Sequence, residues 1–209
     1  MHRLSRAHRA LPGLSAAWPC LLLPSLTFAA VLRVPSEYPS IAGAFVAAVA
    51  GDSILVAPGS YDQLDIVSFR SGVTLLSEGG WETTSLRFAR DAGLLDHGGG
   101  TELPSRVEGF TLLGGRHDFY HPVIFRRNRM IGVAHEAWPF VFLSRSADVL
   151  DNVIEGDADP AVFELFTPVN SGNATWRFER NLIRLSGPLD FASVGGGVRT
   201  RWFSVTTRG

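Results

Sequence analysis

Three charged residues occupy the same position in successive copies of a short repeated segment. Arg127, Asp151 and Arg180 each stand immediately before an asparagine of the repeat. If the copies stack in register, the three side chains form a column of alternating charge. Such a column could bind an acidic sugar through its cations. Alternatively, its members could pair with one another as an exposed salt-bridge column of modest energy.

A second group of polar residues lies in the segment "GGRHDFYHP" (114–122). His117, Asp118 and His121 could together perform acid–base chemistry near neutral pH or bind a transition metal. We predict these three residues as a substrate-binding group. The competing interpretation is an ordinary polar turn, because the spacing of the two histidines suits a metal site on a helix and this segment reads as a loop.

An acidic segment, "EGDADP" (155–160), contains Asp157 and Asp159. Carboxylate oxygens are preferred ligands of Ca²⁺, and paired carboxylates can also serve as acid and base in glycoside hydrolysis. We predict Asp157 and Asp159 as possible Ca²⁺ ligands. The segment lacks the full spacing of a defined calcium loop, so a solvated acidic turn is the alternative.

The composition excludes several kinds of chemistry. All 19 basic residues are arginine. A Schiff-base lysine, a P-loop lysine and a lysine general base are therefore excluded. The sequence also contains no Gly-x-Ser-x-Gly, His-Glu-x-x-His or nucleotide-binding loop.

The elements that must position these residues are short strands with a common frame. Four segments can be aligned on Phe110, Asn128, Asn152 and Asn181, with steps of 18, 24 and 29 residues. An apolar residue lies three positions before and two positions after each of them. This pattern indicates an internal repeat of strand, bend and strand, as in a solenoid. The asparagine tolerates the left-handed conformation of a sharp bend, and stacked amides can form a ladder. An antiparallel sandwich remains the alternative.

A capped helix precedes the repeats. Ser40 is a good N-cap, and Ile41, Phe45 and Val49 form one apolar stripe over about three turns. Gly51 is suited to the C′ position. Because the apolar strand "SILVA" follows at once, we expect the helix to cover the end of a stack of strands.

The N-terminus has the features of a signal peptide, which we assign to residues 1–29. A basic start, "MHRLSRAHR", leads into an apolar stretch interrupted by prolines, which argues against a stable membrane-spanning helix in this segment. No membrane span is expected in the mature chain. Cys20 lies inside this segment, so no disulfide is expected after cleavage. We therefore predict a secreted or periplasmic protein. The formal net charge is −1, which gives no electrostatic support for binding nucleic acid.

Residues 38–63, "YPSIAGAFVAAVAGDSILVAPGSYDQ", resemble the opening of right-handed parallel β-helix proteins of the pectate-lyase-like superfamily. In that superfamily a helix caps the first coil, and "GD-ILV-PG-Y" forms the first strand and turn. The repeated asparagines resemble its asparagine ladder. The resemblance covers about residues 34–185. It implies an all-β fold, a right-handed parallel β-helix with a short N-terminal capping helix, occupying residues 30–209 as one domain.

The superfamily contains lyases, glycoside hydrolases, esterases, epimerases, adhesins and proteins with no known activity, so the fold alone does not decide the function. The resemblance implies a protein that binds or cleaves polysaccharide. Arg127, Asp151 and Arg180 are then the candidate catalytic residues, since arginine serves as base or electrophile in β-elimination by related lyases. The alternative is a non-catalytic surface or scaffold module.

The C-terminal segment "FASVGGGVRTRWFSVTTRG" contains no evident capping helix. An uncapped solenoid exposes strand edges and apolar coil residues. We therefore expect either self-association through this end or a truncated chain, which would be a remnant without activity.

Overall fold

The computed structural model of this chain describes residues 29–63, 66–89, 92–96, 103–133, 141–143, 145–157, 166–168, 175–186 and 198–208. These residues form eighteen strands and one short helix. Each pair of neighbouring strands among them is parallel. The all-β prediction is confirmed, and the antiparallel sandwich is wrong.

The strands stack in three columns. The first column contains β1 (Val31–Val34), β2 (Ser53–Val56), β5 (Thr74–Ser77), β8 (Ser105–Glu108), β11 (Val123–Arg126), β14 (Ala147–Leu150) and the start of β17 (Trp176–Ser186). The second contains β3 (Gly59–Gln63), β6 (Thr84–Phe88), β9 (Thr111–Leu113), β12 (Arg129–Val133), β15 (Val153–Asp157) and the end of β17. The third contains β4 (Val67–Ser68), β7 (Leu94–Asp96), β10 (His117–Phe119), β13 (Val141–Leu143) and β16 (Phe166–Pro168).

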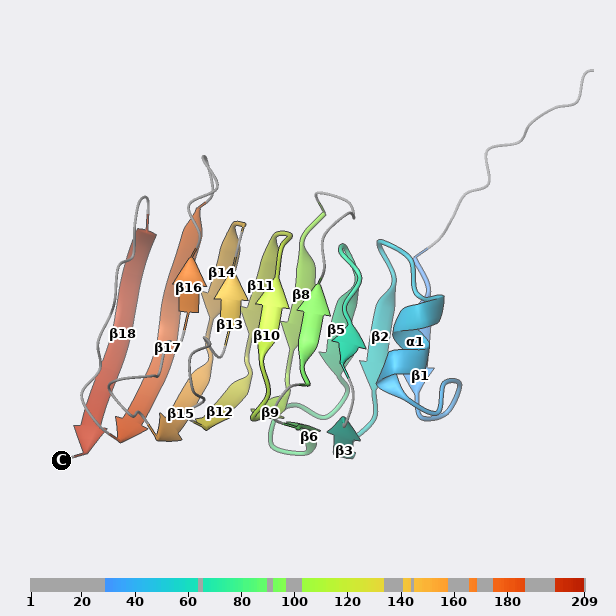
Figure 1. Ribbon diagram of the computed structural model, residues 1–209, viewed down its shortest axis with the longest axis horizontal. Coiled ribbons are helices and arrows are strands. Elements are labelled where there is room, and N and C mark those ends of the chain that lie inside the picture. The colour runs from blue at the N-terminus through green and yellow to red at the C-terminus, as the bar shows by residue number, and fades with distance from the viewer. Residues whose placement is uncertain are drawn as a thin grey trace, which may run out of the picture.

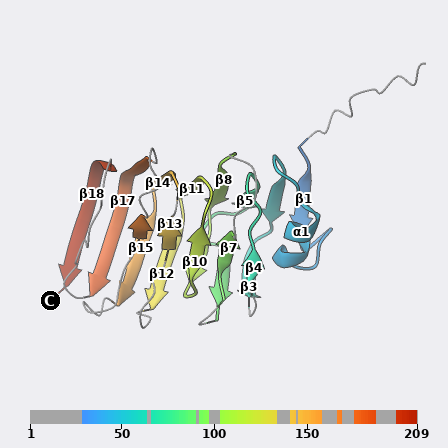
Figure 2. The same ribbon diagram turned by 45° about the horizontal axis from the view of Figure 1, so that its top comes forward.

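The chain visits the three columns in turn, so each round forms one coil, and the arrangement is consistent with a parallel β-solenoid. Figure 1 shows the coils following one another along the long axis, with α1 (Ile41–Ala47) at one end and β18 (Val198–Arg208) at the other. The strand β18 pairs with β17 over its whole length and extends the stack by one coil. Figure 2 gives the same order from a second angle, with β7, β10 and β13 in sequence along the axis.

Alternation of side chains in each strand produces the core. In β6, for example, Leu86 and Phe88 are buried while Arg87 between them is exposed. The buried side chains of successive coils stack on one another. Aromatic contacts run from the helix into the stack: the ring centroids are 4.6 Å apart for Phe45 and Phe69, and 5.3 Å apart for Phe69 and Phe119.

The helix α1 caps the first coil, as predicted from its apolar stripe. It begins after Ser40, whose Oγ accepts a hydrogen bond from Gly43 N at 3.0 Å, and it buries Ile41 and Phe45. It is shorter than predicted, because it ends at Ala47, and Val49 is 55% exposed rather than part of the stripe. Within the described residues no helix combines the length and the apolar character needed to cross a membrane.

Asp52 joins the cap to the first coil, a role that the sequence pattern did not reveal. Its Oδ1 accepts a hydrogen bond from Ala30 N at 2.7 Å, and its Oδ2 accepts one from Val49 N at 2.8 Å. The side chain is nearly buried. A carboxylate that accepts from two backbone N–H groups is strongly held, so Asp52 fixes the start of β1 against the exit from the helix.

The predicted asparagine ladder is present at the bend between the first and second columns. The Oδ1 atoms of Asn128, Asn152 and Asn181 accept hydrogen bonds from the backbone N–H one coil earlier, at 2.9–3.0 Å. Their Nδ2 atoms donate to the carbonyls of Val107, Phe125 and Val149. All three asparagines are buried, so their amides satisfy backbone groups that water does not reach.

The left-handed residue of the bend is different from the one predicted. The asparagines were expected to adopt this conformation, but the positive φ angles belong to the residues before them: 51° for Arg127, 57° for Asp151 and 54° for Arg180. Gly109 takes the same place one coil earlier, with φ of 82°. The asparagine itself must turn its amide inward to reach the neighbouring coil, so the reversal of the chain falls on the preceding residue.

Replacing Asn152 by alanine should destabilise the protein by roughly 2–6 kcal/mol. The substitution leaves two buried backbone groups, Asn128 N–H and Phe125 C=O, without these partners, and each such group costs about 1–3 kcal/mol. Urea unfolding monitored by circular dichroism measures the change. Ser60→Ala, which removes an exposed hydroxyl contact with Ser85, serves as the control and should change stability by less than about 0.5 kcal/mol. Equal stabilities for the two variants would contradict the role of the ladder.

Candidate functional site

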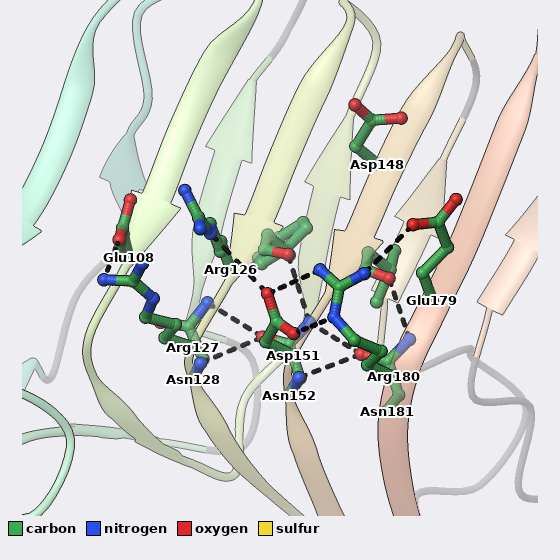
Figure 3. Close-up of polar contacts among 12 residues, drawn as sticks. Glu108, Arg126, Arg127, Asn128, Asp148, Asp151, Asn152, Glu179, Arg180 and Asn181 are labelled. Atoms are coloured by element: carbon green, nitrogen blue, oxygen red, sulfur yellow. Dashed lines mark hydrogen bonds and ion pairs between the residues drawn. The ribbon is translucent and has the colours of Figure 1, made fainter. Parts of the chain in front are cut away.

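The register of the coils brings Arg127, Asp151 and Arg180 into one column at the bend (Figure 3). Arg126 pairs with Leu150 and Leu150 with Glu179 before the bend, while Arg129 pairs with Val153 after it. The three bend residues therefore occupy equivalent places in adjacent coils. The alternating charges predicted from the repeat are confirmed as a spatial arrangement.

Asp151 and Arg180 form the closest pair of the column. Arg180 donates from Nε to Asp151 Oδ1 at 2.5 Å and from Nη2 to Oδ2 at 3.0 Å. Its Nη1 donates to Glu179 Oε2 at 3.2 Å. The guanidinium thus contacts carboxylates on two sides, and the two-point geometry with Asp151 gives this pair more order than a single contact would.

Arg127, the other cation of the column, is about as exposed as Arg180. Its side chain is 58% exposed, and its Nη1 lies 3.4 Å from Glu108 Oε1 in the preceding coil. The adjacent Arg126 points to Asp151, with 3.7 Å between its Nε and Asp151 Oδ2. Two arginines of one coil therefore lie between the carboxylates of the coils on either side of it (Figure 3).

Electrostatics keeps both members of the Asp151–Arg180 pair ionised. The hydrogen bond from Arg180 is the largest cause of a lowered pKa of Asp151; partial burial opposes it, and the charges of Arg180, Arg126 and Arg127 add to the lowering. The same hydrogen bond raises the pKa of Arg180. Asp151 is accordingly a poor proton donor at neutral pH, and Arg180 is a poor base. The arrangement suits charge recognition better than proton transfer.

The predicted substrate-binding residues lie elsewhere, around the third column. His117 is fully buried inside the coil, with its ring centroid 4.9 Å from that of Phe88 and its Nδ1 accepting from Leu94 N at 3.2 Å. Asp118 is also buried and pairs with Arg116 through Nε at 2.9 Å. These contacts place neither side chain on an open surface.

His121 is buried at the turn that follows β10, where its Nδ1 lies 2.8 Å from Asp96 Oδ2. Asp96 is itself buried at the end of β7. The segment "GGRHDFYHP" did not indicate this partner, which is 25 residues earlier in the chain. The frame of the repeats could have indicated it, because β7 and β10 are consecutive strands of one column.

The predicted Ca²⁺ ligands are not tested by this structure. Asp157 ends β15, where the backbone alone is described, and Asp159 lies outside the described residues. Among the residues that are described, no group of three His, Cys, Asp or Glu side chains is close enough to hold a metal ion. The Ca²⁺ hypothesis therefore stays a prediction.

Comparison with known proteins adds no assignment. No protein-family model, curated protein or solved structure matches the chain.

Replacing Arg180 by glutamine should raise the pKa of Asp151 toward its ordinary value. The hydrogen bond from Arg180 is the largest cause of the lowered pKa, and the charge of Arg127 is the smallest. Arg127→Gln is therefore the matched control and should shift the pKa of Asp151 less. A pH titration of the Asp151 carboxyl carbon by NMR measures both. A larger shift in the control would show that the pairing has been assigned to the wrong arginine.

Burial of His117 should make the protein less stable in mild acid. Burial lowers the pKa of His117 to about 4, against a hydrogen bond to Gly114 that acts in the opposite direction. Between pH 6.5 and pH 4 the unfolded chain binds a proton at this side chain and the folded chain does not. The free energy of unfolding is therefore unaffected by protonation of His117 above pH 6.5. It decreases as the pH falls toward 4, by roughly 3 kcal/mol in total.

This loss can be measured by urea unfolding at pH 7 and pH 4.5, together with the titration of the His117 ring by NMR. His117→Gln has no titrating ring and should show a smaller loss of stability across the same interval. A ring that titrates near pH 6.5 in the folded protein would contradict the expectation, even if the variant did not fold.

Proposed function

We propose that this protein is a secreted or periplasmic right-handed parallel β-helix that binds acidic polysaccharide along the bend that carries Arg127, Asp151 and Arg180. The right hand follows the general preference of parallel crossover connections. The observation that carries the proposal is the use of charged residues in left-handed conformation in three consecutive coils.

A side chain in this conformation costs roughly 1 kcal/mol or more, and glycine avoids that cost. Gly109 occupies the equivalent bend in the preceding coil, so glycine fits there. Strained residues that repeat at one place are a reason to infer function. At this bend they direct charged groups outward at each step of the stack.

The spacing of the coils suits a linear polymer. Adjacent coils lie about 4.8 Å apart, so Arg127 and Arg180 are separated by about 10 Å along the axis. A polysaccharide lying along the axis would meet Arg126 and Arg127 first, and would then meet Arg180 two coils later. Arginine suits this task because its planar guanidinium pairs with carboxylates in two-point geometry. The pKa directions of Asp151 and Arg180 favour binding over cleavage.

A non-catalytic surface or scaffold module is the second candidate. It is favoured by the contacts of Arg180, whose guanidinium already meets Asp151 and Glu179 within the chain. In that case the column would act as a structural ion-pair network with no ligand.

Binding of polygalacturonate, with dextran as the neutral comparison, separates the two candidates. Titration calorimetry should detect polygalacturonate at low salt and a weaker interaction at high salt, because exposed charges are screened. Arg127→Gln should weaken the binding by about tenfold. Arg70→Gln, an exposed arginine of another turn, is the matched control and should bind as the original chain does.

The same mixtures should be examined for ultraviolet-absorbing unsaturated products and for new reducing ends, with and without Ca²⁺. Either product would add cleavage by a lyase or a hydrolase to the proposal. Absence of both binding and products with all the polysaccharides would overturn it and leave the scaffold module.

A further inference from the structure

The outer face of the second column carries one line of residues with an internal symmetry. From β3 to β17 the register places six outward residues in succession: Asp62, Arg87, Leu113, Ile131, Glu155 and Arg184. We call them the outer line. In order along the axis they are acidic, basic, apolar, apolar, acidic and basic.

When the order of the outer line is reversed, each charged residue stands opposite one of the other sign and each apolar residue stands opposite another apolar residue. A half-turn about an axis parallel to the strands and midway between β9 and β12 places the first residue opposite the sixth and the second opposite the fifth. Asp62 of one copy then faces Arg184 of another copy. Likewise, Arg87 faces Glu155, and Leu113 faces Ile131. Each charged residue meets the opposite sign, and the apolar residues meet each other at the centre.

The second outward line of this face fits the same operation. It consists of Ser60, Ser85, Thr111, Arg129, Val153 and Leu182. Its one charged residue, Arg129, would face Thr111 of the other copy, whose hydroxyl can accept a hydrogen bond. No like charges oppose each other on either line, and Val153 would face Ser85 of the other copy. Leu113, Ile131 and Val153 are all partly exposed.

We propose that two copies of this chain associate through the outer faces of their second columns, with their long axes antiparallel. An isologous interface uses the same patch on both subunits and must therefore complement itself under a half-turn, as the outer line does. Along the outer line the arrangement resembles the anatomy of protein interfaces, with an apolar pair at the centre and charged residues toward the rim, while Arg129 of the second line lies beside that pair and keeps its hydrogen bond to Glu155. It uses neither the bend proposed for polysaccharide nor the C-terminal end considered from the sequence.

Ion pairs within each copy hold the rim in position for this contact. Arg184 Nη1 donates to Glu155 Oε1 at 3.1 Å, and Arg129 donates to Glu155 Oε2 from Nε at 2.7 Å. At the other end, Arg87 Nε lies 3.6 Å from Asp62 Oδ1, and both side chains are about two-thirds exposed. These exposed pairs are the ones that a second copy would contact.

The area of the outer face indicates how tightly we expect the two copies to bind. Six strands about 4.8 Å apart and about 17 Å long give roughly 400 Å² per copy, or about 800 Å² for both copies, which is below the area of stable specific interfaces and corresponds to weak, transient association. The dimer should therefore be concentration-dependent and weakened by salt. Its affinity should depend strongly on the charge pairs, because like charges across an interface are costly.

Sedimentation equilibrium of the folded chain with two charge-reversal variants tests the proposal. Asp62→Arg puts arginine opposite Arg184 twice in each dimer, and Arg184→Asp puts two acids opposite each other twice. Each variant alone should dissociate at least about tenfold more readily than the original chain. An equimolar mixture restores opposite charges at both contacts, so it should form a dimer with one copy of each variant.

Arg145→Asp, an exposed charge change at the turn before β14, is the control and should leave the dimer unchanged. Circular dichroism and the thermal midpoint establish that each variant is folded. An original chain that stays monomeric at low salt up to roughly millimolar concentration would overturn the proposal. It would also be overturned if either single variant kept the original affinity, or if the mixture of folded variants failed to associate.

Discussion

The hydrogen bonds of the buried asparagine amides are the interaction on which this structure depends. Each coil must turn sharply between the first and second columns, and the turn brings backbone N–H and C=O groups inside the stack. Asn128, Asn152 and Asn181 satisfy these groups with one acceptor and one donor each, and the Nδ2 atoms of Asn128 and Asn152 also donate to the asparagine Oδ1 of the next coil. A shift of one residue would bury an arginine or an aspartate in place of the amide. The ladder therefore sets the register of each coil against its neighbours.

Because the buried asparagines fix the register of the coils, they also determine which outward side chains lie next to one another on the surface. The residue before each asparagine must take the left-handed conformation, and its side chain then projects from the bend. Further along the same coil, Arg129, Ile131 and their equivalents alternate with buried residues on the second column. Two outer surfaces thus arise from one internal constraint. Both pair opposite charges between adjacent coils, but the outer line also has an apolar centre between its charged ends.

Much of this organisation could be predicted from the sequence because it depends on local patterns. The spacing of the asparagines predicted the ladder and the stacking of Arg127, Asp151 and Arg180. Ser40 predicted where the helix begins. The length of the helix could not be predicted, since it depends on Asp52, whose carboxylate binds Val49 N and ends the apolar stripe early. The choice between the asparagine and its neighbour as the left-handed residue also required the geometry of the next coil.

His117 illustrates why residue type alone is a weak guide to sites in such a fold. The side chain points inward together with Phe119, while Asp118 between them takes the opposite orientation. The His117 ring is tolerated in the core because Leu94 N donates a hydrogen bond to it and Phe88 packs against it. In a stack of coils, a chemically useful side chain becomes part of a surface only if its position is an outward one and the equivalent positions of adjacent coils cooperate with it. Surfaces of this protein are therefore lines of equivalent residues, and both the bend and the outer line are of this kind.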